Sequence, residues 1–291
     1  MKSDITKWDS VAEEEVPYTK NVKMERYTKE ELIKRLQEIA DEGWIKGCRK
    51  GNCGSAGNTL EDLLGIEENN LPIPNAAEWE LKTHQANSTA LLTLLHSEPS
   101  PRACNHVSKV LLPKYGWPHK EAGGKYPETE MSFRQTISGA GYSDRGFKVV
   151  VNRDEKKVEI TFNADKIDER HADWKKSVEE RVGLDDFRDK PYWGFEDLKS
   201  AVHGKLLNCF YVIAETKRIK GETYFWFNKA LMLKDFDFER LLVAIENGKA
   251  YVDFDARTGH NHGTKFRVQQ TLIPELYSYA KVVVDNTNKE K

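Results

Sequence analysis

The sequence lacks the features that mark membrane proteins, secreted proteins and zinc-knuckle proteins. No apolar run approaches the roughly 18 residues that a membrane-spanning helix needs, and MKSDITKWDSVAEEEVPY at the start has no apolar segment typical of a secretory signal. The four cysteines, Cys48, Cys53, Cys104 and Cys209, form no CxxC pair, so they indicate neither a zinc site nor a disulfide framework. We therefore expect a cytoplasmic protein with no membrane segment.

The chain also lacks a strong net charge, which is −2, and this excludes a histone-like nucleic-acid binder. The charges are nevertheless unevenly placed along the chain. The segment from Leu60 to Leu81 contains acids but no lysine or arginine, whereas basic residues outnumber acids from Arg102 to Lys148. An acidic centre beside basic segments is typical of a metal-dependent enzyme that acts on a polyanion, although ordinary solvated faces give the same pattern.

A chain of 291 residues is long enough for one large domain or two lobes. Helical spacing of apolar residues predicts a helix over 28–44 that starts at Thr28, and alternation predicts a hairpin over 147–163. Two long strands are expected at 206–218 and 222–233, and their aromatic run 224–227 is expected to pack in the core. The fold class predicted is α+β, with a leader over 1–25 and a lobe boundary within 135–200.

The stretch EWELKTH alternates and predicts a strand, with Glu78, Glu80 and Lys82 on one face and Trp79 and Leu81 on the other. Such a pair of opposite charges is often only an ion pair. Two neighbouring features favour chemistry: a basic glycine-rich loop over 46–58, and a short helix expected to be capped by Thr59 and to carry Glu61. Carboxylates here would suit Mg²⁺, which takes one or two from the protein and keeps waters, and Lys82 would then position or deprotonate an attacking water.

The segment GNTLEDLLGIEENNLPIPNAAEWELKTH resembles the PD-(D/E)xK nucleases, specifically the MvaI/BcnI restriction endonuclease family, and more distantly MutH and Sau3AI. The resemblance implies that Glu61 is the helix acid, residue 75 and Glu80 are metal ligands, and Lys82 is the catalytic lysine. The Leu81 carbonyl would complete the coordination of Mg²⁺. It also implies a PD-(D/E)xK mixed-sheet catalytic lobe, expected over 26–150, and a C-terminal α/β DNA-recognition lobe over 151–291.

Position 75 departs from the family pattern, because Asn75 stands where the family has an aspartate. An uncharged amide oxygen binds a hard cation more weakly than a carboxylate does. Three explanations stay open: an engineered Asp-to-Asn form, a natural variant that recruits Glu61 or Glu78, or a binding protein that has lost catalysis. We predict that this chain binds metal and cleaves poorly, and that Asn75→Asp raises cleavage by orders of magnitude.

The tail DFDARTGHNHGTKFR is the second informative stretch. Taken alone it reads as a polar hairpin, and His260 and His262 lack the spaced partners of a zinc or HNH site. It resembles the recognition segment of the same family, which implies DNA contacts by Asp255, Arg257, His260, His262 and Arg267. These residue types suit the recognition of a C·G base pair, because arginine donates a bidentate pair of hydrogen bonds to guanine and aspartate accepts one from cytosine.

The function that this resemblance implies is a Mg²⁺-dependent type II restriction endonuclease. It would hydrolyse double-stranded DNA at a short G·C-rich site of the CCNGG kind, leave 5′-phosphates, and act as a monomer. Two alternatives stay open: a MutH- or Sau3AI-like endonuclease at GATC, and a non-catalytic, sequence-specific DNA-binding protein.

Overall fold

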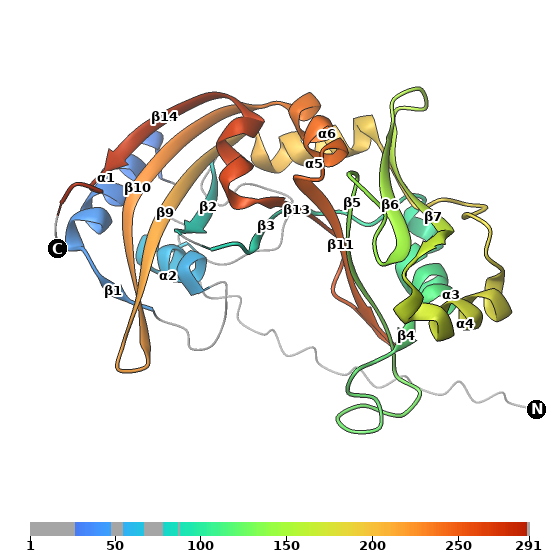
Figure 1. Cartoon of the computed structure of the whole chain (residues 1–291). Helices are drawn as coiled ribbons and strands as arrows, with labels where there is room; N and C mark the ends of the chain where they lie inside the picture. Colours follow the sequence, from blue (N-terminus) through green and yellow to red (C-terminus); the bar gives the residue numbers. More distant parts are fainter. Residues whose placement is uncertain (1–26, 48–54, 67–77, 87, 290–291) are drawn as a thin grey trace, which may run out of the picture.

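The computed structural model describes residues 27–47, 55–66, 78–86 and 88–289. It has the mixed α+β architecture expected from the sequence, with two lobes side by side (Figure 1). Asn75 lies outside the described residues, as do the leader and most of the glycine-rich loop. Within the described residues, no helix is both long and apolar enough to cross a bilayer.

The first lobe is a five-stranded sheet with two helices on one face (Figure 1). The helices are α1 (Lys29–Glu42) and α2 (Ser55–Leu64). The strands, in sheet order, are β1 (Ile45–Lys46), β10 (Glu222–Phe236), β9 (Asn208–Ile219) and β2 (Glu80–Gln85), and β14 (Tyr277–Asp285) pairs with β10. β2 runs parallel to β9 and is the last strand at its side of the described sheet.

The second lobe contains a six-stranded and a three-stranded sheet. The six-stranded sheet has the order β3 (Leu91–His96), β13 (Lys265–Gln269), β11 (Ala250–Arg257), β5 (Met131–Ser138) and β4 (Trp117–Pro118), with β12 (His260–Asn261) paired to β11. The three-stranded sheet has the order β6 (Arg145–Asn152), β7 (Lys157–Ile167) and β8 (Tyr192–Gly194).

Helical segments connect these sheets, and most of them contribute buried residues to the core. They are η1 (Arg102–Cys104), the π-helical η2 (Val107–Leu111), α3 (Leu112–Tyr115), η3 (Glu169–His171), α4 (Ala172–Val182), α5 (Phe195–Leu206), α6 (Phe238–Glu246) and η4 (Gln270–Leu276). α5 leads directly into β9, so it stands where the second lobe joins the sheet of the first.

A division of the chain at residue 150 does not describe this strand pairing. β2 comes before that residue, yet β9, β10 and β14, which complete its sheet, come after it. In the other lobe, β3 and β5 come before residue 150 and pair with β13 and β11 from the C-terminal part. Each lobe is therefore built from both halves of the chain, because crossovers bring together strands that are distant in sequence.

Several predicted elements are confirmed. α1 begins after Thr28, whose hydroxyl accepts a hydrogen bond from the Glu31 amide while the Glu31 carboxylate accepts one from the Thr28 amide. β6 and β7 form the predicted hairpin, and the side chains of Phe225, Trp226 and Phe227 are buried in the core as expected.

The start of α2 is a correction. Thr59 was expected to cap this helix, but α2 begins four residues earlier, at Ser55, and Thr59 lies fully buried within it. Ala56 and Leu60, which are also fully or almost fully buried, show why the helix extends so far back. Core packing of this face outweighs the weak helix propensity of the intervening glycine and asparagine.

The two faces of the first sheet pack against different cores. Leu81 and its neighbour Phe210 face α1 and α2, in a core that includes Leu60. Cys209 and Tyr211 alternate with these residues and belong to the core of the second lobe. Since Glu80 pairs with Cys209 and Lys82 with Tyr211, the charged face of β2 is turned toward the second lobe.

Candidate active site and nucleic-acid interface

Glu80 and Lys82 lie on the same side of β2, as their spacing predicts. Lys82 Nζ is 2.6 Å from Glu80 Oε1. The Glu80 side chain is almost fully buried, with 1% of its surface exposed. A second ammonium also faces this carboxylate: Lys205 Nζ, near the end of α5, is 3.7 Å from the same oxygen. The centre is therefore a buried carboxylate held between two lysines from different parts of the chain.

Two side chains beside Glu80, those of Cys209 and Tyr277, are uncharged near pH 7. Cys209, its partner on β9, is buried, and burial raises the pKa of its thiol to about 12. Burial likewise raises the pKa of Tyr277 well above its ordinary value, and this hydroxyl adjoins the Cys209 thiol. Both groups therefore stay neutral near pH 7.

The helix that carries Glu61 packs on the other face of β2. Leu60 and Leu64 of α2 belong to the same core as Leu81, and Gly57 of this helix lies over Thr83. The convergence of Glu61, residue 75, Glu80 and Lys82 on one ion stays a prediction.

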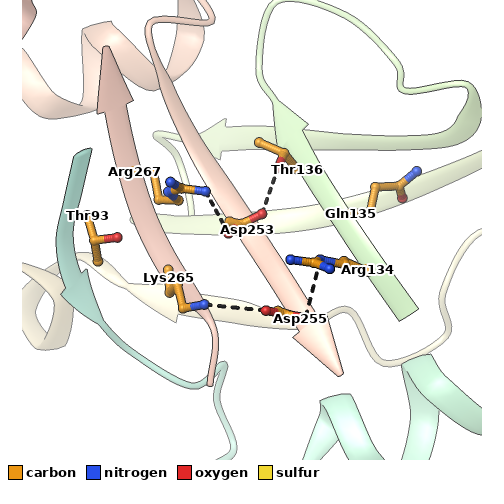
Figure 2. A pocket seen from close by; sticks show the side chains of 8 residues that line it. All are labelled: Thr93, Arg134, Gln135, Thr136, Asp253, Asp255, Lys265 and Arg267. Carbon is orange, nitrogen blue, oxygen red and sulfur yellow. Dashed lines mark hydrogen bonds and ion pairs between the residues drawn. The ribbon is translucent and has the colours of Figure 1, made fainter. Parts of the chain in front are cut away.

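A charged cavity of about 360 Å³ opens on the six-stranded sheet of the second lobe. Figure 2 shows the residues that line it, which are Thr93, Arg134, Gln135, Thr136, Asp253, Asp255, Lys265 and Arg267. Most of these come in pairs spaced by two on a strand, namely Arg134 with Thr136, Asp253 with Asp255, and Lys265 with Arg267. Such spacing places each pair on one face, while Phe133, Phe254 and Phe266 pack into the core behind them.

Ion pairs connect the strands across this face (Figure 2). Asp255 Oδ1 is 3.4 Å from Arg134 Nε, and its other oxygen is 3.7 Å from Lys265 Nζ. Asp253 Oδ2 is 3.2 Å from Arg267 Nη1, and Asp253 Oδ1 accepts a hydrogen bond of 2.6 Å from the Thr136 hydroxyl. The face thus carries hydrogen-bond donors and acceptors in alternation.

The remaining candidate DNA contacts lie at the edge of this face. Arg257 Nη1 is 3.0 Å from Glu130 Oε1, and its guanidinium stands 4.8 Å from the Tyr126 ring centroid. The His260 and His262 rings meet edge to face, with 3.3 Å between Nε2 and Nδ1. Structure therefore brings Asp255 and Arg267 into one cavity, with Arg257 and the two histidines beside it.

The loop that carries the histidines is fixed by Glu98, which sequence analysis did not identify. The Glu98 carboxylate accepts hydrogen bonds from the Thr264 amide at 2.8 Å and from the Asn261 side chain at 3.3 Å. Gly263 has φ +82° in the same turn, a conformation that glycine adopts at little cost. The loop is held against β11 as well, because the His262 amide donates to the Asp255 carbonyl.

The buried carboxylate centre and the charged face adjoin at His96, the last residue of β3. Burial lowers the pKa of His96, and the positive charges of Lys265, Lys205 and Lys82 lower it further. Lys265 lines the charged cavity, whereas Lys205 and Lys82 flank Glu80. His96 pairs with Lys265 across β3 and β13, so it lies beside the charged face and is also influenced by the two lysines that flank Glu80.

Comparison of the sequence with models of known protein families shows which family the chain belongs to. A family model of the MvaI/BcnI restriction endonuclease family matches residues 33–277, which is most of the chain. The chain belongs to the MvaI/BcnI restriction endonuclease family. The buried carboxylate centre and the charged face thus occur in a type II restriction endonuclease, and enzymes of this family generally use a divalent metal ion.

Two solved structures of MvaI are similar to this member of the family. The complex of MvaI with its cognate DNA substrate is 28% identical, with a TM-score of 0.68 over 87% of this chain and 97% of that chain. MvaI without DNA is also 28% identical, over 87% and 96% of the two chains, but with a TM-score of 0.50. No curated protein sequence matches this chain.

Several residues of the charged face and of the Glu80 centre could not be identified from the sequence. Asp253 and Lys265 carry the same signal as the ExK pair, namely charged residues spaced by two around an apolar one, whereas Gln135 interrupts that pattern beside Arg134. The sequence gives no sign of which strands pair, so it does not show that their faces combine. Lys205 carries no signal at all, because it reaches Glu80 only through the pairing of β2 with β9, the strand that follows α5.

Proposed function

We propose that this chain binds double-stranded DNA across the two sites, and that its fold hydrolyses a phosphodiester bond at a short G·C-rich site of the CCNGG kind. The observation that carries the proposal is the adjacency at His96 of the Glu80–Lys82 centre and the charged face. The better superposition on DNA-bound MvaI than on free MvaI supports it. The proposal includes action as a monomer, with the first lobe catalytic and the second reading the sequence.

The described residues fit Mg²⁺ as the metal ion. Glu80 is a buried hard-oxygen donor, and Mg²⁺ takes one or two carboxylates from a protein while keeping several waters. Among the described residues no group of three acidic, histidine or cysteine side chains gathers as a metal site. The resemblance to the family assigns the other protein ligands to residue 75 and the Leu81 carbonyl. The ion, when bound, would polarise the phosphate and lower the pKa of the attacking water.

The roles of the chain's own groups follow from this arrangement. Glu80 would hold the ion, and Lys82 would position the attacking water and offset the charge that develops on the phosphate. Water attacks phosphorus in line and becomes a hydroxyl of the 5′-phosphate, the bond from phosphorus to the 3′ oxygen breaks, and the proton that the water loses is replaced, through solvent, by one on the 3′ oxygen. The products are a 5′-phosphate and a 3′-hydroxyl.

Asn75 is expected to make this chain a poor catalyst. Its amide contributes no formal charge, so the ion is held more weakly than by an aspartate. The three origins of Asn75 give different outcomes: an engineered form and a natural variant both bind metal, whereas a binding protein that has lost catalysis does not cleave even after Asn75→Asp.

The test is to incubate this chain and its Asn75→Asp form with phage DNA and Mg²⁺ and to sequence the fragment ends. We expect Asn75→Asp to raise cleavage by orders of magnitude and the ends to map to one G·C-rich site with 5′-phosphates. Ends at GATC would favour the MutH- or Sau3AI-like alternative. Site-specific binding without cleavage by either form would favour the non-catalytic alternative, which is the second candidate because of Asn75.

A further inference from the structure

Arg134 differs from the other arginines of the charged face in its exposure. Its side chain is 70% exposed, whereas that of Arg257 is 33% and that of Arg267 is 29%. Arg134 lies in the middle of β5, with Thr136 beyond it on the same face and Phe133 packed into the core behind. Arg134 lies outside the residues that the family resemblance assigns to DNA contacts.

The other two arginines are already engaged by protein groups. Arg257 is paired with Glu130 and stacks on Tyr126. Arg267 donates to Asp253 and, at 2.8 Å, to the Leu91 carbonyl. The Arg267 Nε is buried and has no hydrogen-bond partner among the described residues, so it is turned away from solvent.

Arg134 is held in a way that leaves its guanidinium fork available. β5 and β11 pair so that Arg134 stands directly opposite Asp255, and the 3.4 Å contact is made by Nε. The two terminal nitrogens form the fork, and the Arg134 side chain lines the cavity beside Asp255 (Figure 2). Lys265 on the other side of Asp255 holds its second oxygen.

This geometry matches the edge of one base pair in the major groove. Guanine presents O6 and N7 as a pair of acceptors, which an arginine fork satisfies with two hydrogen bonds. The cytosine of the same pair presents its N4 amino group, which a carboxylate accepts. An arginine and an aspartate on neighbouring strands of one sheet therefore offer complementary groups side by side.

We propose that Arg134 and Asp255 together read one C·G base pair of the target, with Arg134 bound to the guanine and Asp255 to the cytosine. This inference rests on the proposed function. It assigns guanine recognition to an arginine on β5, outside the tail over 253–267. In the free protein the two side chains satisfy each other, and the base pair replaces part of that interaction on binding.

The test measures sequence discrimination. After fragment ends have defined the site, dissociation constants are measured by fluorescence anisotropy for that duplex and for duplexes with each base pair replaced in turn. A single wrong base pair weakens a specific complex by about 5- to 150-fold. We expect Arg134→Ala to abolish this discrimination at one C·G pair and to preserve it at the others.

Arg134→Lys separates base reading from charge. Lysine keeps the positive charge but lacks the planar fork, so we expect the salt dependence of binding to be unchanged while discrimination at that pair is lost. Replacing guanines by 7-deazaguanine one at a time removes the N7 acceptor without changing the protein. The chain should lose affinity at one guanine in particular, and Arg134→Ala should be insensitive to that replacement. Arg188→Ala, an exposed arginine that does not line the cavity, is the matched control and should change nothing.

Two results would overturn the inference. One is full discrimination at every position by Arg134→Lys. The other is a uniform loss of affinity for all duplexes by Arg134→Ala with a salt slope reduced by about one, which indicates a phosphate contact. If the unaltered chain binds all duplexes alike, the proposed function itself fails, and this outcome is recognised before any Arg134 variant is compared. Thermal unfolding of each variant verifies that the fold is intact.

Discussion

The contact between Lys205 and Glu80 leads to a prediction about metal affinity. Lys205 Nζ lies 3.7 Å from the oxygen that would bind a divalent ion, so the ammonium and the ion compete for one carboxylate. Replacing Lys205 by methionine keeps most of the side-chain volume and removes the charge. We therefore expect Lys205→Met to bind a divalent ion more tightly than the unaltered chain.

The size of the effect follows from the geometry. Two unit charges at this separation interact by about 4 kcal/mol at an effective dielectric constant of about 20. The Lys205 side chain is 19% exposed, and solvent and salt screen part of this energy. If ~1.4 kcal/mol of this energy remains after screening, the free energy of ion binding improves by that amount in Lys205→Met, and the dissociation constant for the ion falls about tenfold.

Mn²⁺ is a suitable probe, because it prefers the same oxygen ligands and free Mn²⁺ is counted directly by electron paramagnetic resonance. Lys199→Met, an exposed lysine on the same helix, is the control and should leave the Mn²⁺ affinity unchanged. Equal or weaker Mn²⁺ binding by Lys205→Met would refute the competition. Urea unfolding of the same variant is expected to show a lower free energy of unfolding, since Glu80 then has one buried partner fewer.

Three further predictions concern the second lobe and pH. Asp253→Ala leaves Arg267 partly buried without its carboxylate, so the free energy of unfolding in urea should fall by about 1–3 kcal/mol; an unchanged value would mean that the pair contributes nothing. Tyr126→Leu removes the ring under Arg257 and should weaken specific DNA binding several-fold in anisotropy titrations, whereas Tyr126→Phe should retain it; equal behaviour of the two variants would contradict the role of the ring. Burial lowers the pKa of three histidines, which are His84, His96 and His106. Their unfolded forms therefore bind more protons as the pH falls below about 6.5, and the free energy of unfolding should decrease there by up to ~1.4 kcal/mol per pH unit for each proton. Urea unfolding at several pH values measures this, and a constant or rising stability on acidification would disprove it.

Local patterns predict local structure well in this chain. The Thr28 cap, the hairpin of β6 and β7, and the common face of Glu80 and Lys82 each depend on residues close in sequence. α2 was misjudged because its first turn is stabilised by burial rather than by propensity. Local sequence does not report how much of a helix the rest of the protein will cover.

Long-range pairing is what the sequence did not reveal. Sheet order decides that β2 pairs with β9, and only this pairing brings Lys205 to Glu80. The same holds for Arg134 and Asp255, which meet because β5 and β11 are neighbours in a particular register. A shift of one residue in that register would turn Arg134 to the opposite face of the sheet.

The central claim is that Glu80 and Lys82 form the hydrolytic centre. Its most direct test is single-turnover cleavage, in Mg²⁺, of a duplex with the mapped site by Asn75→Asp and by that form with Glu80→Gln or Lys82→Met added. We predict that each added change slows cleavage by at least about a hundredfold, as is usual when a group that stabilises the transition state is removed, while binding of the site persists. Cleavage at the same rate by all three proteins would contradict the claim.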